Sequence, residues 1–423
     1  MNAPRSVTIL TEYFHPEEAS TAQLLTELAS GLTDSFDVSV VTAYPNYHDE
    51  DRDRLVPRRE THEGVEISRV RATRFDKDRI PLRVLNWLTF AFFVFVRLLR
   101  DRRRNDVKLV LSNPPILPFV TWLLKRVRGT PYVYLIYDMY PDMPIGLDVI
   151  SEDGLVARAW EWAIRKVYRN ADQIVVLGDS MEQRLVEKMA DDPGFDPEKI
   201  EVIPNWEDET FIRPMDKSEN DFAHEQGTVE NFTLLYSGNI GRYHELRTAI
   251  DAIALLEERG RSDVEFLIIG EGARKAELQS YVGQQNVQNV RFLSFQPLKR
   301  VPQTLTCADA SLVGIVPEME GICVSSKLYS SLATGQPVLA VVGEGDEVAR
   351  VVRERDCGSF VPQGDAERAA DVLAGWADDP GRAAELGANA RETFENNYTA
   401  DHAIADYADL FEDLFDARSR PVN

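Results

Sequence analysis

The sequence is short of cysteine and lacks the motifs of several enzyme classes. Only three cysteines occur among 423 residues, and Cys307, Cys323 and Cys357 show neither an even count nor metal-type spacing. This excludes a disulfide scaffold and favours a reducing compartment. No pairing of histidines or aspartates suggests a metal, and no G-x-S-x-G segment offers a nucleophilic serine. Because no secretory signal precedes the first apolar run, we expect a cytoplasmic protein.

Positive charge is also scarce. The chain has 47 basic and 70 acidic residues, a net charge of −23, and only 10 of the basic residues are lysine. A broadly negative surface excludes a nucleic-acid partner. The acidic residues are spread along the chain, which favours a halophilic protein whose carboxylates stay hydrated at high salt. Ordinary acidic solubility is the alternative.

One segment reverses this charge. Residues 71–104 contain ten basic side chains and three aspartates, a local charge of 10 − 3 = +7. At their centre, residues 84–96 carry no charge, but this run is shorter than the roughly 20 apolar residues that span a bilayer. We expect a helix at 82–100 that docks on a membrane surface through an apolar face and a basic rim. A helix buried in the core is the alternative.

Apolar runs of strand length alternate with helical periodicity in both halves of the chain. They predict strands at 7–10, 38–41, 65–70, 107–111, 132–136, 174–177 and 201–203, and again at 232–236, 264–269, 290–293, 310–315, 338–341 and 359–361. Continuous apolar strands between helices are typical of parallel sheets covered on both faces. The predicted fold class is α/β, with two doubly wound Rossmann-like domains.

Composition places the domain boundaries. Residues 1–205 form an N-terminal domain, 206–231 a polar linker, 232–395 a C-terminal domain, and 396–423 a helical tail. Ligands of such sheets bind at the carboxyl ends of the strands. Two such domains facing each other predict a cleft suited to group transfer.

The turn after residues 232–236 is rich in glycine. Gly238 and Gly241 precede Arg242, which we place at the start of a helix, and the turn matches neither the dinucleotide fingerprint nor the P-loop. Exposed backbone N–H groups at a helix start favour an anion, and a diphosphate fits. A turn that binds no ligand is the alternative.

Two further turns resemble it. Ser325 or Ser326 is a candidate cap for a short helix whose first turn holds Lys327, where a cation is unfavourable unless an anion binds. A solvated lysine is the alternative. After residues 264–269, Glu271 and Gly272 lie where a base or ribose approaches.

Polar side chains follow three strands of the first half. They are His15, Glu17 and Glu18, then Asn46 and Tyr47, then Asp138 and Asp142. The carboxyl ends of parallel strands meet at one edge, so we expect these groups to face a substrate. A carboxylate there orders hydroxyls or stabilises a developing positive charge, whereas for any single residue a loop hydrogen bond is the alternative.

Taken together, these segments carry a resemblance. The strings YFHPEEASTAQLLTELASGL, YLIYDMYPDMPIG, YSGNIGRYHELRTAIDAI, LIIGEGARKAEL and SSKLYSSLATGQPVLAV occur in one order. Over nearly its whole length the chain resembles the family 4 glycosyltransferases of the GT-B fold, and the branch with bacterial O-antigen and capsule transferases of the WbuB type.

The resemblance implies a function and an arrangement. It implies retaining transfer of a sugar from a nucleotide-sugar, usually a UDP-sugar, with no metal or other cofactor required. The acceptor domain comes first, the donor domain second, and the last helix crosses back onto the first domain. It also implies a polyprenol- or dolichol-linked glycan as acceptor at the inner face of the cell membrane, in agreement with the basic apolar segment.

The sequence departs from the family pattern in the donor domain. Asn239 stands at the usual arginine position and His244 at the usual lysine position. Ile322 and Ser330 stand where the family has a Glu-x7-Glu pair, whose second member binds ribose. Arg242 and Lys327 are therefore expected to supply the missing charge.

These arguments assign the site residues. We expect the donor diphosphate to bind Gly238, Asn239, Gly241, Arg242, Ser326 and Lys327, and the nucleoside to bind Glu271, Gly272 and Ser330. The catalytic candidates are His15, Glu17, Asp138 and Asp142, and the acceptor-side candidates are Glu18, Asn46 and Tyr47. A nucleotide-sugar epimerase or hydrolase, and a catalytically silent nucleotide-binding subunit, are the alternatives.

Overall fold

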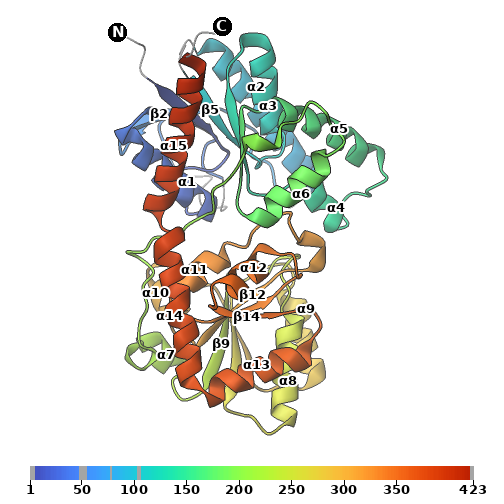
Figure 1. Ribbon diagram of the computed structural model, residues 1–423, viewed down its shortest axis with the longest axis vertical. Coiled ribbons are helices and arrows are strands. Elements are labelled where there is room, and N and C mark those ends of the chain that lie inside the picture. Colours follow the sequence, from blue (N-terminus) through green and yellow to red (C-terminus); the bar gives the residue numbers. More distant parts are fainter. Residues whose placement is uncertain (1–4, 47–54, 77–78, 102–105, 420–423) are drawn as a thin grey trace. The chain divides into compact units, whose positions relative to one another are not determined.

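The computed structural model describes residues 5–46, 55–76, 79–101 and 106–419. The chain divides into two compact units (Figure 1). Residues Met1–Pro204 and Ala400–Asn423 form the first unit, and Asn205–Thr399 form the second. Each unit contains one sheet with its own core.

The first unit is built on an eight-stranded sheet of order β3-β4-β2-β1-β5-β6-β7-β8. Its strands are β1 (Ser6–Leu10), β2 (Asp37–Thr42), β3 (Arg59–His62), β4 (Val65–Arg69), β5 (Asp106–Leu111), β6 (Tyr132–Ile136), β7 (Gln173–Val176) and β8 (Ile200–Val202). All neighbours pair in parallel except β3 and β4. Strands β1, β5 and β6 are buried at every position, as expected for a sheet covered on both faces.

The helices of the first unit include the last helix of the chain. They are α1 (Ser20–Gly31), α2 (Ile80–Arg100), α3 (Leu117–Arg128), α4 (Asp142–Gly146), α5 (Leu155–Asn170), α6 (Asp179–Met189) and α15 (Ala400–Ser419). The rings of Phe411 and Phe415 lie 5.9 and 5.8 Å from the ring of Phe36. The C-terminal helix therefore packs on the first unit, and this prediction is confirmed.

The second unit contains a six-stranded parallel sheet of order β11-β10-β9-β12-β13-β14. Its strands are β9 (Phe232–Ser237), β10 (Val264–Ile269), β11 (Val290–Leu293), β12 (Ala310–Gly314), β13 (Val338–Val341) and β14 (Gly358–Val361). Its helices are α7 (Asp221–Gln226), α8 (Arg247–Glu258), α9 (Lys275–Gln285), α10 (Val301–Leu305), α11 (Lys327–Ala333), α12 (Glu347–Glu354), α13 (Ala366–Asp378) and α14 (Pro380–Asn397). The predicted class of two doubly wound α/β domains is confirmed.

The strand orders locate a switch point in each sheet. In the first unit the chain moves outward from β1 to β2 and later returns to β5 on the other side of β1. In the second unit it moves from β9 to β10 and β11 and then returns to β12 on the other side of β9. Loops that leave the carboxyl ends of these strands form the binding crevice of such folds.

Some segments differ from the prediction. Residues 206–231, expected as a linker, lie within the second unit, where α7 buries Phe222 and Ala223. The tail predicted at 396–423 is α15 (Ala400–Ser419) in the first unit, and α14, which ends at Asn397, belongs to the second unit. The edge strand β3 was not expected, because its residues are polar and alternate between exposed and half-buried.

The helix predicted at 82–100 is α2, and its outer face is apolar. Its inner face buries Asn86, Phe90, Ala91, Val94 and Leu98. Its outer face exposes Ile80, Val84, Leu85, Leu88, Phe92 and Phe93, with exposed fractions from 38% to 60%. By length and composition alone α2 is also sufficient to cross a membrane. The alternative of a fully buried core helix does not fit this exposure.

Candidate active site

The turn after β9 is shaped by glycine. Gly238 has φ +134°, and a Cβ atom on it would lie 2.9 Å from Cε of Lys327. A side chain at position 238 would therefore displace the lysine. Gly241 and Lys327, 86 residues apart, belong to the same site, because both contact His244.

The turn after β10 is joined to the same loop by backbone hydrogen bonds. The amide of Ile240 donates to the carbonyl of Glu271 at 2.7 Å. A Cβ on Gly270 would lie 1.9 Å from the carbonyl oxygen of Gly238, and one on Gly272 would lie 2.4 Å from that of Ile240. These two glycines are thus required by the close approach of two backbones, whether or not a nucleoside binds there.

His244 connects the glycine turn to Lys327. The amide of Gly241 donates to Nδ1 of His244 at 3.0 Å, and Nε2 of the same ring lies 3.2 Å from Nζ of Lys327. Burial, together with the charges of Lys327 and Arg274, lowers the pKa of His244 to about 2, so the imidazole is neutral. Burial also lowers the pKa of Lys327 to about 8. Gly238, Gly241, His244 and Lys327 thus form one cluster at the loops after β9 and β12, which we call the cradle.

The aromatic ring of Tyr236 forms the other side of this cradle. Nζ of Lys327 lies 5.1 Å from the ring centroid, within the range of a cation–π contact. The hydroxyl of Tyr236 donates to the carbonyl of Asn239 at 2.6 Å and so braces the turn. Within the described part of the chain, no carboxylate forms an ion pair with Lys327.

Two local predictions for these turns are wrong. Arg242 does not stand at a helix start, because α8 begins five residues later at Arg247, and Arg242 is exposed in the loop. Ser326 occupies the N-cap position of α11, but its hydroxyl makes no capping hydrogen bond.

The remaining donor-side candidates lie around the cradle. Ser330 donates from Oγ to the carbonyl of Lys327 at 3.3 Å. Glu271 is exposed, and its hydrogen bond with Lys275 lowers the pKa of its carboxyl group. Arg274, which sequence reasoning missed, donates to the carbonyl of His244 at 2.8 Å. The position of Arg274 just after the Gly-Glu-Gly turn was the sequence feature that could have identified it.

Among the acceptor-side candidates, Glu17 and Asn46 come together. Oε1 of the buried Glu17 accepts a hydrogen bond from the amide of Asn46 at 2.7 Å, so the carboxylate joins the loops after β1 and β2. Glu18 is exposed, and Tyr47 lies outside the described residues.

His15 lies beside this pair in the loop after β1. Its ring stacks on that of His62 with centroids 3.6 Å apart. Its carbonyl accepts a hydrogen bond at 2.7 Å from Arg69, a buried guanidinium that the sequence did not single out.

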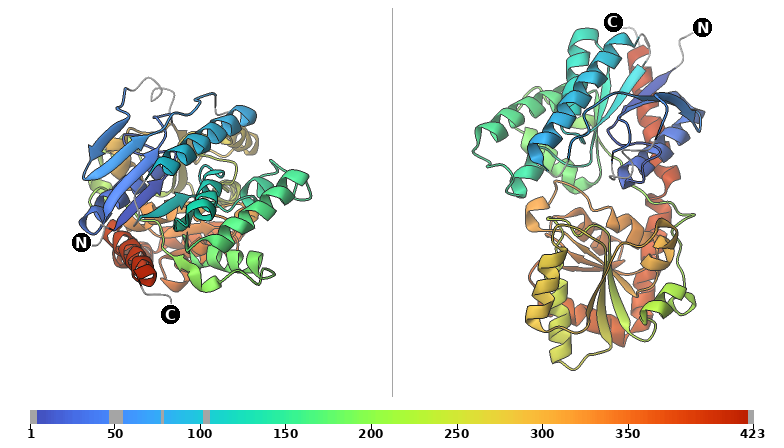
Figure 2. Two further views of the ribbon diagram at one scale, coloured as in Figure 1. Left: turned by 90° about the horizontal axis from the view of Figure 1, so that it is seen from above. Right: turned by 180° about the vertical axis from the view of Figure 1, so that it is seen from behind.

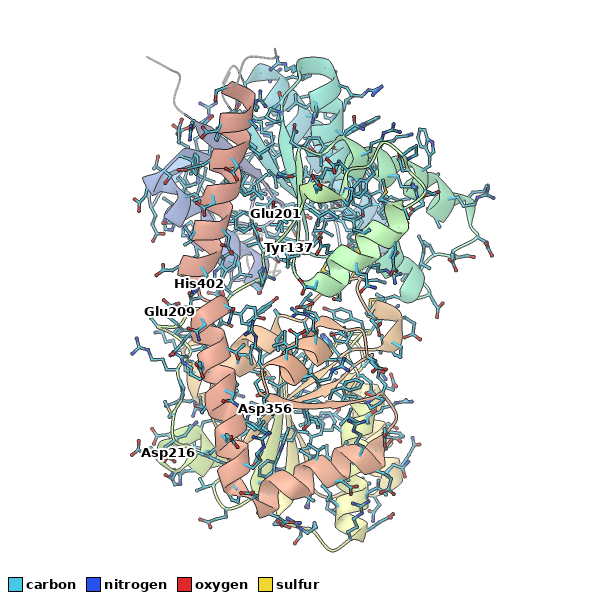
Figure 3. All side chains as sticks on the ribbon, viewed as in Figure 1. Tyr137, Glu201, Glu209, Asp216, Asp356 and His402 are labelled. Carbon is cyan, nitrogen blue, oxygen red and sulfur yellow. The ribbon has the colours of Figure 1, made fainter. Side chains whose placement is uncertain are left out.

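Asp138 and Asp142 follow β6 but differ in surroundings. Asp142 opens α4 and pairs with Lys188 at 2.7 Å and Arg184 at 3.2 Å, which fixes α4 against α6. Asp138 comes directly after Tyr137, which is one of the residues labelled in Figure 3. No hydrogen bond or ion pair to the Asp138 carboxylate is found among the described residues, and burial raises its pKa to about 6.

Replacing Asp138 with asparagine is expected to stabilise the protein at neutral pH. The folded state holds this carboxyl at a pKa of about 6, above its ordinary value of 3.8, so ionisation destabilises the fold as pH rises between these values. After a discount for partial exposure, the gain above pH 6 is about 1–2 kcal/mol. Urea unfolding at pH 7.5 and 4.5 measures it. A variant that is less stable than the wild type at pH 7.5 would contradict the assignment.

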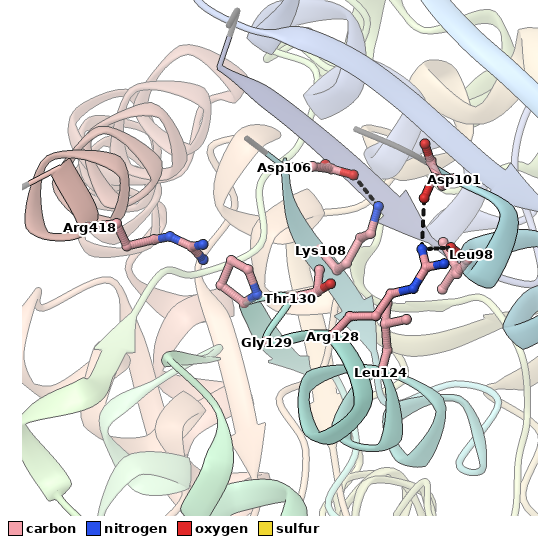
Figure 4. A pocket seen from close by; sticks show the side chains of 10 residues that line it. Leu98, Asp101, Asp106, Lys108, Leu124, Arg128, Gly129, Thr130 and Arg418 are labelled. Carbon is pink, nitrogen blue, oxygen red and sulfur yellow. Dashed lines mark hydrogen bonds and ion pairs between the residues drawn. The ribbon is translucent and has the colours of Figure 1, made fainter. Parts of the chain in front are cut away.

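A cavity elsewhere in the first unit lies away from these loops. It has a volume of about 710 Å³ and is lined by Asp106, Lys108, Arg128 and Arg418, among others (Figure 4). It opens at the amino-terminal ends of β5 and β6, the sheet edge opposite the switch-point loops. Asp106 and Lys108 pair with each other there, and Arg128 donates to the last carbonyls of α2. Asp106, Lys108 and Arg128 thus have structural partners.

Metal-ligand clusters are not found in the part of the chain that the structure describes. No group of three or more His, Cys, Asp or Glu side chains lies in ligating geometry there.

Comparison with known proteins places this geometry in a family. The model for the glycosyl transferase 4-like domain matches residues 21–206, and that for glycosyl transferases group 1 matches residues 217–393. The probable glycosyltransferase WbjE of Pseudomonas aeruginosa is 28% identical over 69% of this chain and 71% of its own. The putative colanic acid biosynthesis glycosyl transferase WcaI of Escherichia coli (strain K12) is 27% identical over 60% of this chain and 61% of its own.

A solved structure has the same fold. Anabaena HepE in complex with UDP-glucose aligns with a TM-score of 0.71 at 15% identity, over 96% of this chain and 99% of that one. Three observations agree. The chain has two Rossmann-like units, its C-terminal helix returns to the first unit, and the two family models match successive parts of the sequence. The chain is a glycosyltransferase with the GT-B fold and belongs to family 4, the group 1 glycosyltransferases.

Proposed function

We propose that this enzyme transfers a sugar from a nucleotide-sugar, specifically a UDP-sugar, to a lipid-linked glycan or surface-polysaccharide precursor, with retention of configuration. The observation that carries the proposal is the cradle of Gly238, His244 and Lys327 at the switch point of the second unit. The relatives support it, since HepE binds UDP-glucose and WcaI is named for colanic acid biosynthesis.

The donor side acts on the leaving group. Lys327 and the exposed Arg242 offset the charge that develops on the departing diphosphate. The amides of Gly238, Ile240 and Gly241 already donate within the protein, so only the amide of Asn239 in this turn donates to the phosphate oxygens in this proposal. In this proposal the reaction needs no metal ion, because these groups supply the positive charge. Glu271, Gly272 and Ser330 border the nucleoside.

The first unit supplies the acceptor side. The bond from the anomeric carbon to the phosphate oxygen breaks, the bond to the acceptor oxygen forms on the same face, and the departing phosphate takes the acceptor proton. This route needs no strong general base. His15 and Asp138 face the acceptor and the transferred sugar, whereas Glu17 and Asp142 hold the loops that position them.

The transfer experiment uses the purified full chain. It is incubated with a panel of radiolabelled nucleotide-sugars and native membranes, and the lipids are then extracted. We expect label in the lipid fraction with a UDP-sugar. Release of free sugar or of an epimer without lipid labelling would overturn the proposal in favour of a hydrolase or epimerase. UDP binding without turnover on any membrane extract would indicate a silent subunit.

We also propose that the enzyme is a peripheral membrane protein of the cytoplasmic face and docks through α2. The 21 residues of α2 extend about 31 Å, yet its inner face packs on the first unit, which favours a helix lying on the membrane. Arg79 and Arg83 flank its start, and Arg97 and Arg100 its end.

Neighbouring helices extend the same surface. Helix α3 packs between α2 and α5, and α2 and α5 lie at the outside of the first unit (Figure 2). Leu123 and Val127 on α3 are exposed, as are Leu155, Val156 and Trp162 on α5. We call these side chains and the outer face of α2 the apolar docking face.

A further inference from the structure

The contact between His244 and Lys327 fixes where protons reside in the empty site. The amide of Gly241 is a donor, so Nδ1 of His244, 3.0 Å away, must accept and carries no proton. A neutral imidazole then keeps its proton on Nε2. That N–H points at Nζ of Lys327, 3.2 Å away.

An ammonium group does not suit this position. It has three donors and no acceptor, so it cannot accept the Nε2–H bond. A neutral amine has a lone pair and can accept it. The arrangement of Gly241, His244 and Lys327 is therefore satisfied by a neutral imidazole and a neutral amine.

The surroundings of Lys327 act on its charge in both directions. The Tyr236 ring on one side is a cation–π partner that favours the ammonium. The Cys323 thiol, on the loop before α11, would also favour the ammonium if it were ionised. Burial in these surroundings lowers the pKa of Lys327 to about 8.

We propose that, at alkaline pH, His244 is a positioning residue that holds Lys327 as a neutral amine in the empty donor site, and that a nucleoside diphosphate then binds together with one proton taken up by Lys327. The proposal rests on the proposed donor site and deepens it. When the diphosphate arrives, its negative charge favours the ammonium, which leaves Nε2 and donates to phosphate oxygens.

Proton uptake predicts a direction for the pH dependence. Below about pH 7 the lysine is already charged, so binding takes up almost no proton. Above pH 8 each bound nucleotide must bring a proton, and its affinity falls by up to about tenfold per pH unit. This dependence is opposite to the one expected from the nucleotide alone, whose terminal phosphate has a pKa of about 6 and gains charge as pH rises.

Calorimetry of the full chain measures the uptake directly. UDP, GDP and ADP are titrated in turn at pH 8.5 and pH 7, each in several buffers of different ionisation enthalpy. The observed binding enthalpy is plotted against the ionisation enthalpy of the buffer, and the slope gives the number of protons taken up per nucleotide bound. We expect an uptake of about 0.75 proton per nucleotide at pH 8.5 and close to zero at pH 7.

Variants separate His244 from a general effect of charge. In His244→Asn the amide oxygen replaces Nδ1 and keeps the Gly241 bond, but no N–H reaches the lysine, so uptake at pH 8.5 should fall below about 0.3. His244→Gln, whose amide oxygen accepts from the ammonium, should do the same and serves if the first variant does not fold. Lys299→Met, an exposed lysine on the loop before α10, should keep the wild-type uptake.

The outcomes distinguish this inference from the function on which it rests. Nucleotide binding with no uptake at pH 8.5, or with full uptake in both His244 variants, overturns the role of His244 and leaves the donor site intact. No binding of any nucleotide at either pH removes the donor site, and this inference with it.

Discussion

Lys327→Met weakens nucleoside diphosphate binding at pH 7 by an expected factor of about 100, or roughly 2.7 kcal/mol. At that pH the lysine is charged when the anion is bound, and charge-assisted hydrogen bonds to a diphosphate are the strong ones. Methionine keeps the length and apolar body of the side chain, so it fits against Gly238 and the Tyr236 ring. The fold should therefore be unchanged, and the loss reports the charge.

Titration calorimetry with UDP measures this loss, and near-UV circular dichroism checks the fold. Lys275→Met is the matched control, because Lys275 is also the first residue of a helix that follows a carboxyl-edge turn. Its charge is already neutralised by Glu271 at 2.7 Å, so we expect less than a fivefold change. Equal losses in the two variants, or an undiminished affinity in Lys327→Met, would mean that the diphosphate does not bind in the cradle.

The second large effect concerns the apolar docking face. Leu88 and Phe92 are one helical turn apart on α2 and are exposed by 47% and 60%. If both insert into the membrane interface, the double substitution Leu88→Asp, Phe92→Asp removes about 3–6 kcal/mol of apolar burial. Binding to vesicles that contain an anionic phospholipid should then fall at least about 100-fold.

Flotation of the purified protein with such vesicles tests this prediction. Phe295 and Leu298 in the second unit are exposed by 55% and 47%, so Phe295→Asp, Leu298→Asp is a control of the same chemistry away from α2. It should float like the wild type. Raising the salt concentration should weaken wild-type binding, because the arginines at both ends of α2 act through screened attraction. Wild-type protein that stays at the bottom of the gradient, or equal flotation of both double variants, would contradict membrane docking through α2.

Most strands could be predicted because their burial is continuous. Tyr132–Ile136 and Val264–Ile269 lie in sheets covered on both faces, so every position is apolar or tightly packed, and the run itself marks the strand. The polar β3 lacks that signal, since it is an edge strand held by its antiparallel pairing with β4. Helix α7 had a signal that was missed. The Asn220 side chain accepts from the amides of Phe222 and Ala223, and Gly227 ends the helix in the left-handed region.

The candidate site was only partly readable. The glycine turn at 238–241 and Lys327 each carried a local signal for an anion. The sequence did not reveal that the glycine turn and Lys327 are in contact. It also did not reveal that Glu17 binds the amide of Asn46, or that Asp142 pairs with two cations of α6. Contacts of this kind join residues 29 to 83 positions apart, so no local pattern contains them.

The sequence by itself determined the two α/β units, the family, the glycine-rich turn after β9, and the basic, apolar nature of α2. Each of these depends on short-range periodicity, composition or local motifs. The tertiary structure alone decided that His244 lies between Gly241 and Lys327, because this depends on β12 pairing beside β9 and bringing its loop to the same sheet edge. It likewise decided which face of α2 is exposed, since packing against the rest of the first unit, including α3, and not the helix sequence, chooses the side that is buried.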